Sequence, residues 1–243
     1  MIKQAVILSA GLGARLRPYT DAMPKPMIPI LGKPLLEWHI EQYKKHGVSE
    51  FFINTHYLPE VIKDHFGDGS KFGVRVTYSF EPVILGTAGG IKQFELQLDE
   101  RFYFIYGDTF SLVDYSAMAA AYAAKKDPIG MQRVKETRDY ADADVAELDR
   151  DGQFVAIHAK PHTMVYPNAY RLRGASIFER RILSYIPPGV PYEVGKQLLP
   201  AVVAAGEKFY GYECNDYSKG IDTEEKWKEV EGELTKQGIA PWW

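Results

Sequence analysis

The chain has 243 residues, of which 46% are hydrophobic and 25% charged, and its formal net charge is −3. This composition is typical of a folded globular protein and excludes disordered and fibrous classes, and the lack of a basic excess disfavours nucleic acid as a partner. The single cysteine, Cys214, cannot form an internal disulfide. We find no signal peptide and no apolar run near the roughly 20 residues of a membrane helix, which predicts a cytoplasmic protein without a membrane partner.

Apolar and amphipathic segments alternate in the first half of the chain, as in the βαβ units of a largely parallel sheet. Strands are predicted at residues 4–11, 50–57, 74–80, 101–108 and from 127 onward, and helices at 34–47, 58–66 and 115–126. Leu36, Ile40 and Tyr43 share one face of the helix at 34–47, which ends at Gly47. The nearly continuous apolar strand at 101–108 is predicted to be central, because central parallel strands are buried on both faces.

Shorter, antiparallel pieces are predicted in the second half. A hairpin with an Asp-Gly turn covers 145–161, a strand follows at 170–178, and a strand pair covers 208–222. Helices are predicted around 179–186, at 195–206, and in a final segment with Trp227, Val230 and Leu234. We therefore predict one α/β domain over residues 1–243, built on a doubly wound, mostly parallel mixed sheet, with halves at about 1–140 and about 141–243.

Ligands of an open parallel sheet bind beyond the carboxyl ends of its strands, which directs attention to the stretch AVILSAGLGARLRPYTDAMPKP at residues 5–26. Gly11 and Gly13 follow the first strand, where missing side chains let backbone N–H groups approach an anion. Leu16 stands where the dinucleotide-binding pattern has its third glycine, and no lysine followed by serine or threonine closes a Walker loop. The two glycines predict a phosphate loop of neither common type.

Positive charges accompany these glycines. Arg15, Arg17 and Lys25 fall in the same stretch, and Pro24 and Pro26 restrict the backbone of Lys25. A cation held in this way suits phosphate binding. A glycine turn with surface cations is the alternative interpretation.

Six segments in this order resemble the sugar-1-phosphate nucleotidylyltransferases, or NDP-sugar pyrophosphorylases. They are SAGLGARLRPYTDAMPKPMIPILGKPLLEWHI, GTAGGIK, FIYGD, AKP, GKQLLP and GIDTEEKW. The resemblance implies the Rossmann-like fold of nucleotide-diphospho-sugar transferases, with a nucleotide-binding first half and a partly antiparallel, sugar-phosphate-binding second half. It also implies the partners, a nucleoside triphosphate and a sugar 1-phosphate, and a reaction assisted by Mg²⁺ in which the sugar phosphate attacks the α-phosphorus and releases pyrophosphate.

The resemblance also implies roles for individual residues. The nucleotide would be bound by Leu8, Ala10, Gly11, Gly13, Glu81, Gly86 and Thr87. Arg15 would neutralise the departing pyrophosphate, and Lys25 would stabilise charge between the α-phosphate and the leaving group. Asp108 and Asp222 would hold Mg²⁺, with Asp108 counted among the catalytic residues together with Arg15 and Lys25. Lys160 and Arg173 would bind the sugar phosphate.

Five of these residues have simpler alternatives. Asp108 could cap a strand or a helix, and Lys160 could be a solvated lysine after the hairpin. Asp222 could cap the helix that begins near Glu224. Glu81 could be an exposed charge before Pro82, and Arg173 could be a structural arginine that faces solvent.

The acceptor segments depart from the family pattern. Ala159 stands where many relatives carry glutamate, and LRGAS at 172–176 replaces the usual asparagine-alanine-glycine stretch. The usual contacts to a hexose hydroxyl are therefore in doubt. With Arg173 in this segment, a more acidic or otherwise unusual acceptor is one interpretation.

Two sets of segments predict different nucleobases for the triphosphate. Residues 32–53 and 234–243 resemble the glucose-1-phosphate cytidylyltransferase-like branch and predict CTP, whereas LRPYTDAMPKP and LGTAGG resemble relatives that use GTP, UTP or dTTP. Trp242 and Trp243 at the end of the chain could pack on the protein itself or on a second subunit, and the second alternative predicts a homo-oligomer. A non-catalytic regulator that binds a nucleotide sugar is the alternative function, and a dinucleotide-dependent oxidoreductase is disfavoured by Leu16.

Overall fold

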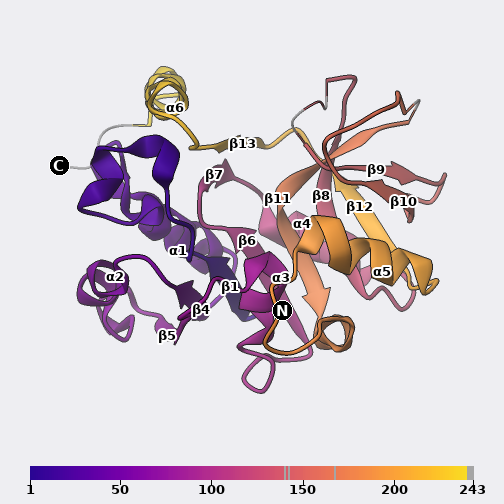
Figure 1. Cartoon of the computed structure of the whole chain (residues 1–243), viewed down its shortest axis with the longest axis horizontal. Coiled ribbons are helices and arrows are strands. Elements are labelled where there is room, and N and C mark those ends of the chain that lie inside the picture. Colours follow the sequence, from indigo (N-terminus) through magenta and orange to yellow (C-terminus); the bar gives the residue numbers. More distant parts are fainter. Residues whose placement is uncertain (140, 142, 167, 240–243) are drawn as a thin grey trace.

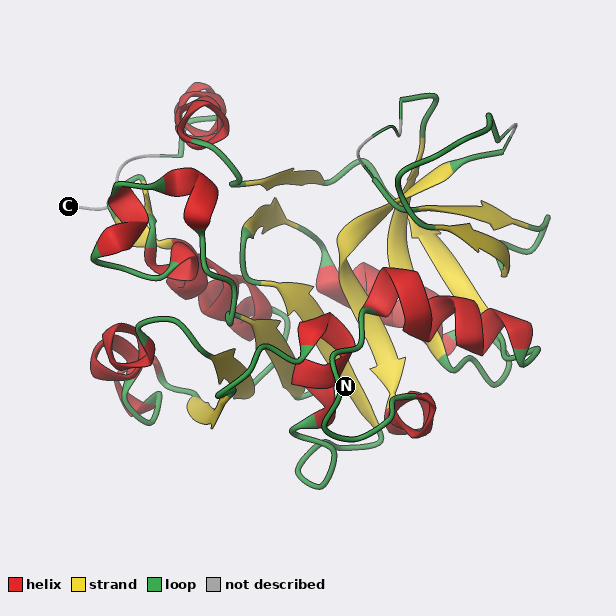
Figure 2. Cartoon of the chain, in the orientation of Figure 1, coloured by secondary structure: helices red, strands yellow, loops and turns green. Residues whose placement is uncertain are grey.

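A mixed sheet runs through the centre of this computed structural model, which describes residues 1–139, 141, 143–166 and 168–239. Nine strands of the described chain form it, and its main path runs β10-β9-β11-β6-β1-β4-β5 (Figures 1 and 2). Four neighbours are parallel: β6 (Arg101–Tyr106), β1 (Gln4–Leu8), β4 (Glu50–Thr55) and β5 (Arg75–Phe80). The predicted strands of the first half are therefore present, and β6 lies in the middle of the sheet.

The antiparallel part of the sheet comes from the second half of the chain, as predicted. Strand β11 (Tyr170–Glu179) runs antiparallel to both β6 and β8 (Gly130–Glu136). The predicted hairpin consists of β9 (Val145–Leu148) and β10 (Phe154–His158). Along the main path, parallel pairing therefore changes to antiparallel pairing between β6 and β11, and one further parallel pair forms between β8 and β12 (Phe209–Glu213).

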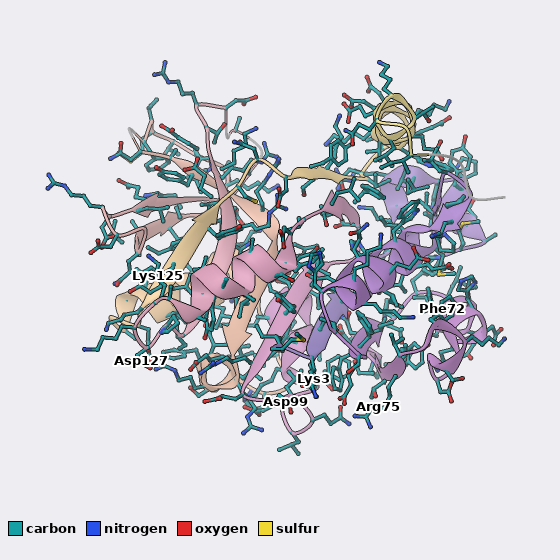
Figure 3. The ribbon with its side chains drawn as sticks, turned by 180° about the vertical axis from the view of Figure 1, so that it is seen from behind. Lys3, Phe72, Arg75, Asp99, Lys125 and Asp127 are labelled. Atoms are coloured by element: carbon teal, nitrogen blue, oxygen red, sulfur yellow. The ribbon has the colours of Figure 1, made fainter. Side chains whose placement is uncertain are left out.

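Helices cover both faces of the sheet, because neighbouring residues of each central strand point to opposite sides. On one face, Ala5 and Ile7 belong to a core with α1 (Leu35–Lys45), α2 (Pro59–Phe66) and α4 (Tyr115–Ala123). On the other face, Val6 belongs to a core with α3 (Gly86–Lys92) and α5 (Leu199–Ala204). Figure 1 shows α3 and α5 in front of the sheet, and Figure 3, seen from behind, shows α1 and α4 on the other side. This is the predicted doubly wound arrangement.

A third apolar cluster fastens the C-terminal segment onto the N-terminal one. Helix α6 (Glu224–Lys236) packs Val230 and Leu234 against Leu16 and Ile30, and it lies beside the early turns of the chain in Figure 1. Short strands β2 (Pro29–Ile30) and β3 (Lys33–Pro34) pair with each other next to this helix. Short 3₁₀ turns lie at Ala14–Leu16, Tyr19–Asp21, Lys25–Met27 and Ser70–Phe72. Residues more than 200 positions apart in the sequence are thereby brought to one place.

Three predictions about the second half need correction. The strands predicted as a pair at 208–222 do form, but β12 (Phe209–Glu213) pairs with β8 and β13 (Tyr217–Gly220) pairs with β7 (Thr109–Leu112). The segment around 179–186 is a 3₁₀ helix at Arg180–Tyr185. The segment at 195–206 begins with a π turn at Val194–Leu198 before α5 starts. The apolar pattern predicted where these segments lie, whereas their strand partners and the type of helix depend on tertiary packing.

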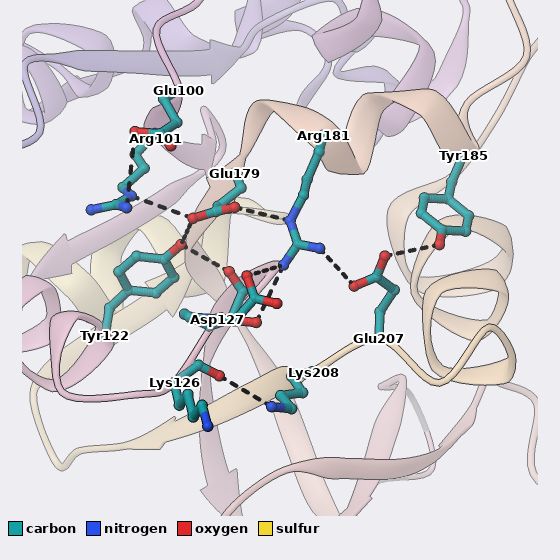
Figure 4. Close-up of polar contacts among 11 residues, drawn as sticks. Glu100, Arg101, Tyr122, Lys126, Asp127, Glu179, Arg181, Tyr185, Glu207 and Lys208 are labelled. Atoms are coloured by element: carbon teal, nitrogen blue, oxygen red, sulfur yellow. Dashed lines mark hydrogen bonds and ion pairs between the residues drawn. The ribbon is translucent and has the colours of Figure 1, made fainter.

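A charged network ties the far end of β11 to its surroundings (Figure 4). Arg181 donates to Glu179, Glu207 and Asp127 at 2.9, 3.0 and 3.1 Å. The hydroxyl of Tyr122 donates to Glu179 at 3.0 Å. These residues lie near Arg101, at the edge where β6 begins, so this network supports the sheet at the end away from the carboxyl ends of the parallel strands.

Among the described residues, no helix combines the length and the apolar character that crossing a membrane requires. Trp242 and Trp243, on which the predicted self-association depends, lie outside the described residues.

Candidate active site

Most of the predicted site residues follow the carboxyl ends of the parallel strands β1, β5 and β6. Figure 3 labels Lys3, Arg75 and Asp99 along the opposite edge, where these strands begin. Beyond β1, the backbone N–H of Ser9 donates to Asn54 Oδ1 at 2.7 Å, which fastens the glycine loop to the strand beside it. The site therefore lies where ligands of open α/β sheets are expected.

Gly11 and Gly13 serve different purposes in this loop. Gly13 has a φ of +64°, and a Cβ there would lie 3.0 Å from Thr20 Cγ2 and 3.2 Å from Lys25 Cβ. A side chain at position 13 is therefore unfavourable, because the positive φ strains its backbone and its Cβ would crowd the neighbouring side chains. At Gly11 a Cβ would meet no atom within 4 Å, because that position faces open space. Gly13 shapes the loop, whereas Gly11 leaves room for a ligand.

Lys25 stands at the centre of the site. Its side chain is buried, with the residue 8% exposed, and its Nζ donates to Asp108 Oδ2 at 2.6 Å and to Asp222 Oδ1 at 2.9 Å. Pro24 and Pro26 flank it at the start of a short 3₁₀ turn, as the sequence indicated. Charge-assisted hydrogen bonds of this kind hold the ammonium group between two carboxylates that come from distant parts of the chain.

Asp222 binds a second cation beside Lys25. Arg15 Nη2 donates to Asp222 Oδ1 at 2.9 Å, and Lys226 Nζ lies 3.7 Å from Oδ2. Burial would raise the pKa of Asp222, but the hydrogen bond and charge of Lys25, followed by the charges of Arg15 and Lys226, lower it overall. The alternative interpretation of Asp222 as a helix cap is wrong, because the Thr223 side chain accepts from Lys226 N and caps α6.

The pair Asp108 and Asp222 also suits a divalent metal ion. Both carboxylates already converge on one positive group, Lys25 Nζ. No cluster of three or more His, Cys, Asp or Glu side chains suited to a metal occurs within the described residues. Mg²⁺ commonly takes one or two protein carboxylates and completes its shell with phosphate oxygens and water. Two converging carboxylates therefore fit Mg²⁺ carried on a phosphate ligand.

A first cavity, with about 640 Å³ of empty space, opens between the glycine loop and α3. Leu8, Ala10, Gly11, Glu81, Gly86 and Thr87 line it, together with Lys25 and Asp108. All predicted nucleotide-binding residues except Gly13 are therefore in its wall, and Gly13 lines a smaller adjoining cavity that also includes Lys25, Asp108 and Asp222.

Glu81 is part of the framework of this first cavity. It is 1% exposed, which makes the alternative of an exposed charge wrong. Its Oε1 accepts from Asn54 Nδ2 at 2.7 Å and its Oε2 accepts from Leu85 N at 2.8 Å. Since Asn54 also holds the glycine loop, Glu81 connects that loop to the start of α3.

Glu193 is a cavity residue that sequence reasoning missed. Its Oε2 accepts from Thr87 Oγ1 at 2.7 Å, and Thr87 Oγ1 accepts in turn from Val194 N at 2.8 Å. At Gly86, with a φ of +70°, a Cβ would lie 2.8 Å from Tyr192 O. The hydrogen bond between Thr87 and Glu193 spans 106 residues of sequence. In the sequence, Glu193 is marked only as an acid just before the predicted helix at 195–206.

A second cavity, with about 1140 Å³ of empty space, lies on the other side of the aspartates. It contains both predicted sugar-phosphate residues, Lys160 and Arg173, and the backbone N–H of Lys160 donates to Asp144 Oδ1 at 3.0 Å. Arg173 is partly buried in the cavity wall, so the alternative of an arginine facing solvent is wrong. Sequence reasoning missed further polar lining residues, which include Gln132, Asp144, Arg171 and Lys226.

The two cavities meet at the charged centre. Lys25 and Asp108 line the first, Arg15 and Asp222 line the second, and Tyr106 lines both. Burial raises the pKa of the Tyr106 hydroxyl, and the nearby charges of Asp144, Glu193 and Asp108 raise it further, so the phenol stays protonated between the cavities. Two ligands, one in each cavity, would approach each other at Lys25 and the aspartates.

Known proteins are similar to this chain in sequence. The nucleotidyl transferase family model matches residues 4–234. A UTP–glucose-1-phosphate uridylyltransferase of Synechocystis is 33% identical over 96% of this chain and 64% of its own length. A mannose-1-phosphate guanylyltransferase of Mycobacterium tuberculosis is 32% identical over 98% of this chain and 66% of its own length. The chain thus spans slightly less than two thirds of these relatives.

A solved structure supports the fold. The structure of a UDP-glucose pyrophosphorylase with UDP-glucose aligns over 98% of this chain and 100% of its own, with a TM-score of 0.82 and 19% identity. The predicted fold class is confirmed.

Proposed function

Because the chain belongs to the nucleotidyl transferase family, we propose that it transfers a nucleoside monophosphate from a nucleoside triphosphate to a sugar 1-phosphate. An oxygen of the sugar phosphate would form a bond to the α-phosphorus. The bond from the α-phosphorus to the oxygen that bridges to the β-phosphorus would break, and pyrophosphate would leave with that electron pair. The position of Lys25 between Asp108 and Asp222, where two cavities meet, is the observation that carries this proposal.

The nucleotide would occupy the first cavity. Gly11 offers the open backbone that a phosphate chain needs, while Leu8, Ala10, Gly86 and Thr87 would surround the nucleoside. Arg15 would face the departing pyrophosphate, and Lys25 would neutralise charge that develops near the α-phosphate. Phosphoryl transfer depends mainly on positioning and charge neutralisation, so a buried, fixed cation such as Lys25 suits this reaction.

The sugar 1-phosphate would occupy the second cavity, with Lys160 and Arg173 as its cationic contacts. Lys160 follows the β10 strand, and its backbone is held by Asp144. An acceptor bound there would present its phosphate toward Arg15 and Asp222, on the side where the first cavity begins.

Asp108 and Asp222 would hold Mg²⁺, which when bound neutralises phosphate charge and orients the reacting oxygens. Lys25 lies between the same two carboxylates, to which it donates hydrogen bonds of 2.6 and 2.9 Å.

CTP is the nucleotide that we predict from the sequence, and this preference remains a prediction. Part of the segment behind it, residues 240–243, lies outside the described structure. The relatives described above are named for UTP and for mannose-1-phosphate guanylyl transfer. UTP and GTP are therefore the triphosphates against which CTP has to be compared.

Pyrophosphate release tests the proposal. CTP, GTP, UTP, dTTP and ATP would each be incubated with Mg²⁺ and a panel of sugar 1-phosphates. We expect release with at least one pair of substrates, and none from Asp108→Asn, whose amide is a weaker metal ligand of the same size. Asp64→Asn, on the exposed side of α2, serves as the matched control and should react like the unmodified protein. Binding of a nucleotide sugar without any release would support the non-catalytic regulator instead.

A further inference from the structure

Lys226 is a cation of the second cavity that has no part in the function proposed above. It belongs to the first turn of α6, and its side chain is 43% exposed. It lines the second cavity together with Asp222 and Arg15. The described lining of the smaller cavity at the glycine loop includes Arg15, Lys25 and Asp222 but not Lys226. Lys226 therefore faces the acceptor side of Asp222, not the triphosphate side.

The two oxygens of Asp222 have different partners. Lys25 Nζ and Arg15 Nη2 both donate to Oδ1, each at 2.9 Å. Lys226 Nζ lies 3.7 Å from Oδ2, which makes an ion pair longer than an ordinary hydrogen bond. Within the described chain, the Lys226 ammonium donates no hydrogen bond. Its three N–H groups can therefore bind a ligand.

Helix α6 holds the backbone of Lys226 in a fixed place. The next residue, Trp227, donates from Nε1 to Pro29 O at 2.8 Å. One turn further on, Glu231 Oε1 accepts from Leu31 N at 2.7 Å. Both bonds join the helix to the N-terminal segment that also carries the glycine loop. The Lys226 side chain thus projects into the cavity from a helix that is anchored to the rest of the site.

An acceptor phosphate has to approach Asp222 in order to react, because the second cavity meets the charged centre there. A phosphate and a carboxylate repel each other unless a cation lies beside them. Lys25 and Arg15 bond Oδ1 of Asp222, and the proposed reaction uses both of them on the triphosphate side. Lys226, beside Oδ2, is placed to compensate a phosphate that arrives from the acceptor side.

We propose that Lys226 binds the phosphate of the acceptor sugar beside Asp222, and that it thereby sets the affinity for the sugar 1-phosphate. This inference rests on the proposed function, since it adds a binding residue to the same site. An ammonium group binds a phosphate oxygen through a charge-assisted hydrogen bond, which is stronger than a bond between neutral groups. Lys160 and Arg173 would hold the acceptor from the side of β10 and β11, and Lys226 from the side of α6.

Steady-state kinetics of Lys226→Met test this proposal, with the triphosphate and the sugar 1-phosphate that give the highest rate. We expect KM for the sugar 1-phosphate to rise about tenfold or more, in line with the loss of a charge-assisted hydrogen bond. KM for the triphosphate should stay nearly unchanged, because Lys226 lies on the acceptor side. An unchanged KM for the sugar 1-phosphate would overturn the proposal.

Lys228→Met is the matched control. Lys228 lies on the same helix and also pairs with the acid four residues before it, since its Nζ lies 2.6 Å from Glu224 Oε1. It is not among the described residues that line the second cavity. This variant should keep both KM values of the unmodified protein. An equal rise of KM for the sugar 1-phosphate in both variants would assign the effect to the overall charge of α6 and contradict direct binding by Lys226.

The ion pair with Asp222 offers another explanation, in which Lys226 only positions that carboxylate. The dependence of the rate on Mg²⁺ concentration, measured at saturating substrates, separates the two explanations. If Lys226 binds the acceptor phosphate, Lys226→Met needs the same Mg²⁺ concentration for half of its maximal rate as the unmodified protein. A shifted Mg²⁺ dependence with an unchanged KM for the sugar 1-phosphate would show that Lys226 acts only through Asp222.

Calorimetry with glucose, galactose and mannose 1-phosphates, each without a triphosphate, separates this inference from the proposed function. Binding that weakens about tenfold in Lys226→Met but not in Lys228→Met supports the inference even if no triphosphate gives pyrophosphate. Pyrophosphate release, together with equal binding by Lys226→Met and the unmodified protein, supports the function and contradicts the inference. Neither binding nor pyrophosphate release with any of these sugars would contradict both.

Discussion

Lys25 Nζ lies 2.6 Å from Asp108 Oδ2, although 83 residues separate them in the sequence. The same ammonium also bonds Asp222, so one buried cation joins the N-terminal loop, the end of β6 and the segment before α6. Removing it would take this partner from both carboxylates, although Asp222 would keep its ion pairs with Arg15 and Lys226. Lys25 therefore has two effects that experiments can separate, one on the charge of the site and one on its stability.

Replacing Lys25 with methionine should lower kcat about 100-fold or more, in line with the loss of a preorganised group that stabilises transition-state charge. Methionine keeps much of the side-chain volume, so the effect comes mainly from the charge. Steady-state kinetics and thermal unfolding should be measured together. Normal turnover with a reduced melting temperature would assign Lys25 a structural role alone.

Replacing each of the two loop glycines with alanine should affect a different property of the protein. Gly13→Ala forces a Cβ against Thr20 and Lys25 at a positive φ, and we expect it to reduce the free energy of unfolding by about 1–3 kcal/mol. Gly11→Ala meets no atom within 4 Å and should leave stability nearly unchanged, but it narrows the first cavity and should raise KM for the nucleotide. Urea unfolding and initial rates on both variants check this, and equal stability losses would contradict it.

Glu81→Gln should destabilise the protein although the shape is preserved. Both oxygens of Glu81 accept from N–H donors, at Asn54 Nδ2 and Leu85 N, and a glutamine amide would place its NH₂ group against one of them. Leaving a buried donor unpaired costs about 1–3 kcal/mol. Chemical denaturation measures this loss. The exposed Glu60→Gln is the control, and similar stability of the two variants would show that Glu81 is not a structural acceptor.

His39 should make stability depend on pH. Burial lowers its pKa to about 4, and the charge of Asp108 opposes this only in part. The folded protein then binds this proton less readily than the unfolded chain, whose histidine titrates near a pKa of about 6.5. The contribution of neutral His39 to stability is therefore present above pH 6.5 and is lost as pH falls toward about 4. Unfolding at a series of pH values should show this slope, and His39→Leu should reduce it.

Local sequence pattern was enough to predict most elements of the sheet. The alternation in residues 1–140 predicted β1, β4, β5, β6 and the helices α1 and α2, because burial on one or both faces dictates the period of apolar residues. It did not predict α3, the short glycine-rich helix between β5 and β6. The strands in 208–222 were found but given the wrong partner. Pairing across the chain, such as β13 with β7, depends on contacts that no local pattern encodes.

The site was predictable where a motif is continuous and was missed where contacts are distant. Lys25 and Gly13 belong to one short stretch, so their positions followed from it. Glu193 reaches Thr87 across 106 residues, and an isolated acid before a helix gave no sign of this. For Glu81, an exposed position was the alternative interpretation, because a charge beside a proline usually lies at the surface. The side chain is instead buried, and two N–H donors satisfy its carboxylate oxygens.

The position of an isotope in the products tests the central claim most directly. The protein would be given a sugar 1-phosphate that it accepts and the same triphosphate labelled with ³²P at either the α or the γ position. The account predicts that the α label appears in a nucleotide sugar and the γ label in pyrophosphate, in equal amounts. Release of the γ label as orthophosphate, or an α label found only in free nucleotide, would contradict transfer to the sugar phosphate.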